Sequence, residues 1–272
     1  MPDEVVYFVH ISDTHFGPTA DYSRHGHYPV PCARRVVEII NHLPQRPDFV
    51  VHTGDVVTEP DPAAYRLAAE TLAPLDAPIY YVVGNHDTAA DIRRYLPMGH
   101  KEDVDHDPDR LSYAFAVKGY RFLVLDARGP DEIEPNGLLP DSQFEVVARE
   151  AGPEGPPLTI FLHYPVLTMN SIWMDKHMPV LNGEALHQAL RPAQSRLRGV
   201  FYGHVHQHMQ NIRDGIRYTS TASVFSQFAA WPGDADVRYD PDELPGYSFV
   251  HLLPDQTIIH HHSFPRPAVS NS

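Results

Sequence analysis

Short apolar runs alternate with amphipathic stretches along the first third of the chain. Apolar runs that end in a polar turn occupy residues 5–12, 48–55 and 78–87. Between them, residues 32–43 and 61–75 carry apolar side chains at helical spacing. Asp61 followed by Pro62 is typical of a helix start, because aspartate caps the first turn and proline needs no N–H there. This β-α-β-α-β order predicts a sheet covered by crossover helices, with a polar loop that runs from the first strand to Pro31.

The second half of the chain contains more strands and closer turns than the first. The pattern predicts a hairpin over 111–126, a helix over 141–151, a strand over 158–165, a helix over 183–190, a strand and a hairpin over 199–222, and two strands over 246–264. Lys118-Gly119 and Asp214-Gly215 are the expected hairpin turns. There is no internal repeat and no linker between domains. We therefore expect one layered α/β domain with two sheets over residues 1–264, followed by a disordered tail over 265–272.

Polar side chains with metal-binding chemistry follow these strands, at the point where each strand ends. They are Asp13, His15, Asp55, Asn85, His86, Asp87, His163, His204 and His206. In an open α/β sheet, ligands bind outside the carboxyl ends of the strands, so these groups can converge at one edge. A mixture of carboxylates, imidazoles and an amide suits Zn, Mn or Fe better than Ca or Mg. Leaving out His86 and Asp87, the two aspartates, four histidines and one asparagine make seven ligands, which are too many for one ion but suffice for two ions that share a carboxylate.

Composition and charge narrow the possible partners. The chain has 272 residues and a formal net charge of −14, with no Lys/Arg cluster, so we expect no binding to duplex nucleic acid. No apolar run approaches the ~20 residues that cross a bilayer. The N-terminus has acidic residues where an export signal needs basic ones. The single cysteine, Cys32, excludes an internal disulfide. These features favour a cytoplasmic location.

Five short motifs occur in a fixed order along the chain. They are Asp13-Thr14-His15, Gly54-Asp55, Gly84-Asn85-His86-Asp87, His163, and Gly203-His204-Val205-His206. This series resembles the calcineurin-like metallophosphoesterase superfamily. The opening HISDTHFG is most similar to bacterial class III cyclic-nucleotide phosphodiesterases and the related glycerophosphodiesterases. The resemblance implies a four-layer α/β/β/α sandwich, in which two mixed β-sheets are flanked by helices.

The resemblance also implies a role for each residue at the strand ends. It assigns Asp13, His15, Asp55 and His206 to a first divalent transition-metal ion, and Asp55, Asn85, His163 and His204 to a second. Asp55 would bridge the ions, and a hydroxide held between them would attack phosphorus. His86 would bind the phosphoryl group or protonate the leaving alkoxide. Asp55 and His86 are therefore the expected catalytic residues.

Two positions depart from the pattern of many relatives. Thr58, followed by Glu59, stands where many relatives carry a carboxylate that orients the catalytic histidine. Thr58 also argues against the iron–tyrosinate site of purple acid phosphatases. After His163, Tyr164 stands where close relatives often have a second histidine. What orients His86 stays open at this point.

The leading hypothesis is a phosphodiesterase for small diesters: a 3′,5′-cyclic nucleotide, a 2′,3′-cyclic nucleotide or a glycerophosphodiester. The alternatives are a phosphomonoesterase or nucleotide pyrophosphatase, and a catalytically silent binding scaffold. Residues 164–183 are apolar around Trp173, which predicts a cap over the substrate, a contact in a homodimer or larger homo-oligomer, or packing on the protein's own core. Trp173 and His27 are the candidate substrate-binding residues. His10 and His52, which lie inside apolar strands, are expected in the core or behind the site.

Overall fold

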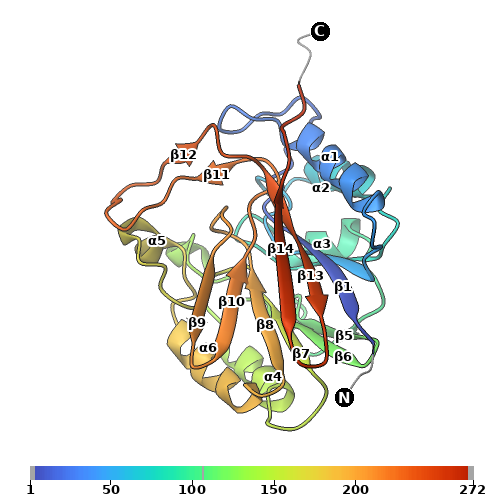
Figure 1. The fold of residues 1–272 in the computed structure, drawn as a ribbon. Helices are drawn as coiled ribbons and strands as arrows, with labels where there is room; N and C mark the ends of the chain where they lie inside the picture. Colours follow the sequence, from blue (N-terminus) through green and yellow to red (C-terminus); the bar gives the residue numbers. More distant parts are fainter. Residues whose placement is uncertain (1–3, 106, 269–272) are drawn as a thin grey trace.

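The computed structural model describes residues 4–105 and 107–268 (Figure 1). Two large mixed sheets pack against each other. The strands of the first sheet, in spatial order, are β14 (Thr257–Ser263), β13 (Gly246–Leu252), β1 (Val6–Ile11), β2 (Phe49–His52) and β3 (Ile79–Tyr81). Those of the second are β4 (Glu102–Asp103), β5 (Tyr113–Val117), β6 (Tyr120–Val124), β7 (Leu158–Phe161), β8 (Leu197–Tyr202), β10 (Ile216–Ser220) and β9 (Gln210–Arg213). A small pair joins β11 (Gln227–Phe228) to β12 (Tyr239–Asp240).

Helices cover the outer faces of both sheets. The helices are α1 (Pro29–Asn41), α2 (Pro62–Leu72), α3 (Ala89–Tyr95), α4 (Asp141–Glu150), α5 (Ile172–His177) and α6 (Gly183–Leu190), with 3₁₀ turns at Asp131–Ile133 and Arg191–Ala193. Apolar residues of α1 and α2 join the core of the first sheet, and those of α4 and α6 join the core of the second. The predicted α/β fold with two mixed sheets flanked by helices is confirmed.

Aromatic side chains fill the space between the two sheets. Phe8 and Phe49 of the first sheet stack with ring centroids 5.1 Å apart, and Phe122, Phe161 and Phe201 of the second sheet meet them edge to face. All five rings are fully buried. Aromatic pairs in this geometry add stabilisation beyond the area that they bury. The packed centre holds the two sheets in a fixed relation, and therefore also holds the loops at their carboxyl ends.

Local chemistry explains the elements that the sequence predicted well. The Asp61 carboxylate accepts the backbone N–H of Ala63 at 2.6 Å, which caps α2 as expected. Lys118 and Gly119 form the turn between β5 and β6, both with positive φ. Helix α1 begins at Pro29, earlier than predicted, because the N-terminal turn of a helix tolerates proline. The sequence pattern missed α3, α5, β4, β11 and β12, which are too short to show a periodicity.

The end of the chain continues past β14 along the protein surface. The Arg266 guanidinium donates hydrogen bonds to the carbonyl oxygens of Phe225 and Pro241, at 3.0 and 3.3 Å. The tail predicted to be disordered begins at residue 265, and its last part, residues 269–272, lies outside the described residues.

Candidate metal centre and substrate pocket

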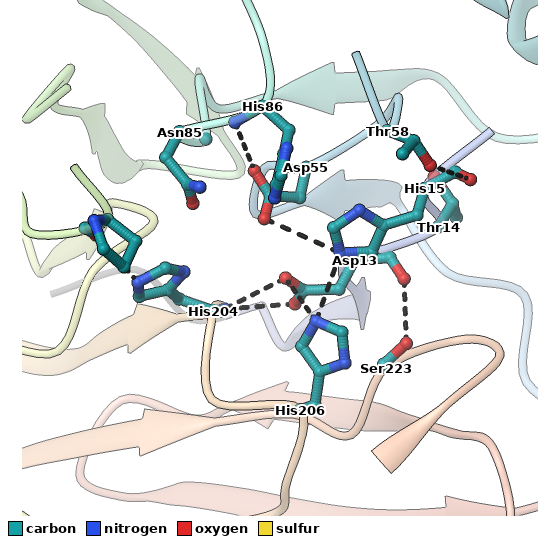
Figure 2. A network of polar contacts seen from close by, with 12 residues as sticks. Asp13, Thr14, His15, Asp55, Thr58, Asn85, His86, His204, His206 and Ser223 are labelled. Carbon is teal, nitrogen blue, oxygen red and sulfur yellow. Dashed lines mark hydrogen bonds and ion pairs between the residues drawn. The ribbon is translucent and has the colours of Figure 1, made fainter. Parts of the chain in front are cut away.

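The strand ends bring all the predicted ligands to one edge of the two sheets (Figure 2). Asp13 and His15 follow β1, Asp55 follows β2, Asn85 follows β3, His163 follows β7, and His204 and His206 follow β8. Five of these residues, Asp13, His15, Asp55, His204 and His206, have φ between 46° and 68°. Non-glycine residues adopt this left-handed conformation at a cost, and such strain is concentrated at functional sites.

A first cluster of ligand atoms surrounds the His206 ring. His206 Nε2 lies 3.2 Å from His15 Nε2 and 3.3 Å from Asp13 Oδ1. His15 Nε2 lies 3.6 Å from Asp55 Oδ2 (Figure 2). Asp13, His15 and His206 therefore place ligand atoms within 4.8 Å of one another, and Asp55 borders this group beside His15.

A second cluster surrounds the His163 ring. His163 Nε2 lies 3.0 Å from His204 Nδ1, 3.3 Å from Asn85 Oδ1 and 3.4 Å from Asp55 Oδ2. The same oxygen of Asp55 thus borders both clusters, as a bridging ligand must. The seven residues present fit two ions.

The spacing of these atoms suits ligands that would share one ion. Metal–nitrogen bonds of ~2.0–2.1 Å would place such ligand atoms roughly 3 Å apart. The distances in both clusters, 3.0 to 3.6 Å, lie around this value. Without an ion, one ring of each histidine pair can donate to the other, and when both rings are neutral with their outer nitrogens protonated, both lone pairs face the cluster and can ligate a cation.

Backbone carbonyl groups orient three of the histidine rings. His163 Nδ1 lies 2.7 Å from the Thr53 carbonyl oxygen, His206 Nδ1 lies 2.8 Å from that of Ser226, and His204 Nε2 lies 3.1 Å from that of Pro135. Each carbonyl can only accept, so it holds a proton on that nitrogen and leaves the other nitrogen's lone pair facing the cluster. The protein therefore selects the tautomer that binds a metal ion.

Burial and neighbouring charges set the ionisation of the site. Burial alone would raise the pKa of the Asp55 carboxyl, but the His163 and His86 imidazoles hold it well below its usual range. Burial lowers the pKa of His204 to about 3 and that of His15 well below the usual value, so both rings are neutral. Burial opposes protonation of His163 too, but Asp55 raises its pKa to about 9. A proton on His163 would leave when an ion binds.

Thr58 contacts the backbone of His15, a candidate ligand, and not the His86 ring. Its hydroxyl donates to the His15 carbonyl oxygen at 2.9 Å, and Glu59 is exposed. The His86 ring lies edge-on to the His15 ring, with centroids 5.1 Å apart. Within residues 4–105 and 107–268, it forms no side-chain hydrogen bond. The imidazole is therefore free to meet a substrate.

Two acidic side chains that the motif analysis did not assign support the centre. The Asp87 carboxylate accepts the backbone N–H groups of Val56, at 3.1 Å, and Gly84, at 3.1 Å, and so ties the turns after β2 and β3 together. Glu134 Oε1 accepts from Asn85 Nδ2 at 3.2 Å, which turns the amide oxygen toward His163. Asp87 belongs to a quoted motif, but Glu134 lies in a loop without any sequence signal.

A cavity of about 400 Å³ opens over the metal centre. Trp173, Phe228 and Tyr239 form an aromatic wall, and Arg24 lies on the same lining as Asp55 and His86. The candidate Trp173 therefore borders the cavity. His27 does not, because its backbone pairs with that of Arg24 across a tight turn and its ring lies outside the lining. Arg24, Phe228 and Tyr239 were missed, since Arg24 lies in a loop and the other two lie in the two-residue strands β11 and β12, which are too short to show a pattern.

Residues 164–183 pack mainly on the protein's own core. Trp173, Met174 and Met178 are buried in the second hydrophobic cluster, and only Ile172 and Leu181 are well exposed among the large apolar side chains of this segment. The segment therefore serves as a wall of the cavity. In the part of the chain that the structure describes, no helix has the length and apolar character needed to span a membrane.

Comparison with known sequences agrees with the motif analysis. A sequence model described as calcineurin-like phosphoesterase matches residues 6–208. The chain is similar to the 3′,5′-cyclic adenosine monophosphate phosphodiesterase CpdA of Pseudomonas aeruginosa, at 29% identity over 93% of this chain and 88% of that protein. It is also similar to the glycerophosphodiester phosphodiesterase GpdQ of Enterobacter lignolyticus, at 32% identity over 72% of this chain and 69% of that protein.

Two further comparisons concern length and fold. A Psychrobacter protein named as a "probable cyclic nucleotide phosphodiesterase" is 29% identical over 78% of this chain, and the match covers 62% of that longer protein. Among solved structures, a dimetal phosphatase from Danio rerio superposes with a TM-score of 0.72 at 18% identity, covering 97% of each chain. At that identity the likeness shows the fold alone.

Proposed function

Because the chain belongs to the calcineurin-like phosphoesterase family, we propose that it is a phosphodiesterase that hydrolyses small cyclic nucleotides at its seven-ligand centre. Asp13, His15, Asp55 and His206 would hold one ion, and Asp55, Asn85, His163 and His204 the other. The proposal rests chiefly on the aromatic wall beside this centre. When bound, the ions supply Lewis acidity and lower the pKa of water toward neutrality.

The aromatic wall favours a planar base as the group next to the phosphate. The Phe228 ring stacks on the His206 ring with centroids 4.4 Å apart, and the Trp173 and Tyr239 rings lie 5.2 and 5.0 Å from that of Phe228. Stacking of a base on an aromatic side chain is worth about 1–3 kcal/mol. A glycerol group, which has no aromatic face, would gain less from such a surface. Cyclic nucleotides therefore fit better than glycerophosphodiesters without a cationic head group.

The residues of the chain itself would bind and orient this substrate. The cavity volume of about 400 Å³ suits one nucleotide and not a duplex, and the net charge of −14 opposes polyanions. His86 lines the cavity, and its imidazole, which forms no hydrogen bond to the part of the chain that the structure describes, can carry the proton that the leaving oxygen needs. Asp55 fixes the backbone of His86 and so keeps this ring beside the metal ligands.

A substrate panel with manganese-loaded protein tests this function. The panel contains 3′,5′-cyclic AMP, 3′,5′-cyclic GMP, 2′,3′-cyclic AMP, glycerophosphocholine, bis(p-nitrophenyl) phosphate and p-nitrophenyl phosphate. We expect the highest kcat/KM for a cyclic nucleotide, and loss of that activity on chelation. A preference for glycerophosphocholine would contradict the assignment to cyclic nucleotides, and the aromatic wall would then bind the choline cation. No turnover of any ester would favour the binding scaffold.

A phosphomonoesterase or nucleotide pyrophosphatase is the second candidate, because Arg24 places beside the centre a cation that has no carboxylate partner among the described residues. A dianionic substrate would gain most from that charge, and faster turnover of p-nitrophenyl phosphate than of any diester would favour it. We further propose a reducing compartment such as the cytoplasm, since the sole cysteine, Cys32, is a buried free thiol. The homodimer or larger homo-oligomer stays a prediction that light scattering can test.

A further inference from the structure

We propose that Arg24 forms a binding subsite for a phosphate oxygen at the edge of the metal centre. This inference rests on the proposed function, because it assumes that a phosphate ester occupies the cavity. It holds for a diester and for a monoester alike. Its test can therefore fail or succeed independently of which ester the protein hydrolyses.

A tight turn fixes the backbone of Arg24. The Arg24 N–H donates to the His27 carbonyl oxygen, and the His27 N–H donates to that of Arg24, both at 2.9 Å. His25 and Gly26 between them have φ of 52° and 77°, the signs that a type I′ turn requires. Such a turn presents its flanking side chains in a defined direction. The residue is therefore held in position although it lies in the loop between β1 and α1.

The neighbouring His25, which is itself fixed by the distant Tyr239, then holds the guanidinium over the cavity. Arg24 Nε donates to His25 Nε2 at 2.9 Å, and the His25 ring stacks on Tyr239 with centroids 3.5 Å apart. Tyr239 and Arg24 both line the cavity. The Nη1 atom reaches to 3.4 Å from His15 Nδ1, so the positive group stands next to a ligand of the first ion.

The charge of Arg24 has no anionic partner in residues 4–105 and 107–268. By contrast, Arg121 pairs with Glu150 at 2.8 Å, and Arg213 pairs with Glu184 at 2.6 Å. A half-buried guanidinium gains by meeting an anion, because burial weakens its hydration. Its planar fork of N–H groups matches the oxygens of phosphate. A phosphoryl group in the cavity would supply the missing partner.

The contact with His15 does not compete with that partner. His15 can offer Nε2 to an ion only if its proton lies on Nδ1. A protonated Nδ1 cannot accept a hydrogen bond from Arg24. In the ligand-binding tautomer, the Nη1 donors of Arg24 are thus left for an oxygen in the cavity.

Binding of inorganic phosphate to the manganese-loaded protein tests the subsite without any turnover. We expect Arg24→Gln to weaken phosphate binding about 10- to 100-fold by calorimetry, the usual effect of removing a hydrogen bond to a charged group. Arg24→Lys keeps the charge but loses the fork, so we expect an intermediate affinity. Arg34→Gln, which removes an exposed guanidinium on α1, is the matched control and should bind phosphate as the wild type does.

Metal content, measured by mass spectrometry on the same samples, tells whether Arg24 binds phosphate directly or acts by positioning His15 as a metal ligand. The proposal requires that Arg24→Gln keep the metal content of the wild type. If this variant binds phosphate as tightly as the wild type, or loses an ion, the subsite is wrong; in the second case Arg24 positions His15. A wild type that binds phosphate through Arg24 but hydrolyses no diester would refute the proposed function and leave the subsite intact.

Discussion

Asp55 accepts the backbone N–H of His86 at 3.0 Å through Oδ1, while its Oδ2 faces both clusters of histidine nitrogens. One carboxylate therefore joins the two halves of the centre. It also fixes the backbone of His86, the residue expected to protonate the leaving group. Oδ1 binds the His86 backbone and Oδ2 faces the candidate metal ligands. A substitution that changes mainly Oδ2 can therefore test the role of this carboxylate in metal binding.

Asp55→Asn should lose bound metal at both positions. The amide oxygen can still accept from the His86 N–H, but the amide nitrogen cannot ligate an ion or neutralise its charge. We expect metal content, measured by mass spectrometry after dialysis, to fall together with activity, measured as diester hydrolysis. Asp61→Asn, which keeps a helix cap far from the centre, is the control. Full metal content in Asp55→Asn would contradict the bridging role.

His86→Ala should separate metal binding from turnover. The ring has no hydrogen bond to the described residues and is not among the predicted ligands. We therefore expect two ions to remain, while kcat falls by about 10²–10⁴, the range for loss of a general acid. His100→Ala removes an exposed imidazole and should change neither property. Wild-type turnover in His86→Ala would exclude the acid role.

Glu134→Ala should weaken mainly the second ion. Glu134 holds the amide of Asn85 at 3.2 Å, and loss of such an orienting partner typically costs 10–100-fold in metal affinity. A metal titration should show one unchanged site and one weaker site. The neighbouring Glu132→Ala, also a surface glutamate, is the matched control. Equal weakening of both sites would mean that Glu134 supports the loop as a whole.

The sequence predicted the sheet, and the meeting of the candidate ligands at its edge, for one physical reason. A side chain that follows a buried strand is placed by that strand, as Asp13 is by β1 and His163 by β7. Glu134 and Arg24 come from loops and Tyr239 from the two-residue strand β12, segments whose course depends on tertiary packing. His27, the candidate substrate-binding residue, does not line the cavity, whereas Arg24 in the same turn does. The sequence of a turn does not tell which of its side chains faces the cavity.

Cys32 should resist alkylation in the folded protein. Burial raises the pKa of this thiol to about 11, so about one thiol in a thousand is ionised at pH 8. Since the folded pKa lies above that of a free thiol, near 9, this group makes folding less favourable as pH rises from about 9 to 11. Iodoacetamide labelling at pH 8 should be slow natively and fast in denaturant. Rapid native labelling would show that the helix α1 opens readily.

Gly84→Ala should disrupt the bridging ligand, because no space exists for a side chain there. A Cβ at Gly84 would overlap both Oδ1 and the backbone nitrogen of Asp55. The backbone cannot yield as a flexible side chain would, so we expect about 1–3 kcal/mol lower stability in denaturant unfolding, together with loss of metal.

Gly152→Ala is the control for that change, since a Cβ there meets nothing within 4 Å. It should retain the stability and metal content of the wild type. If Gly84→Ala instead keeps both ions, the turn after β3 has room to move away from Asp55. The close approach of these two turns would then not be what holds the bridging carboxylate in place.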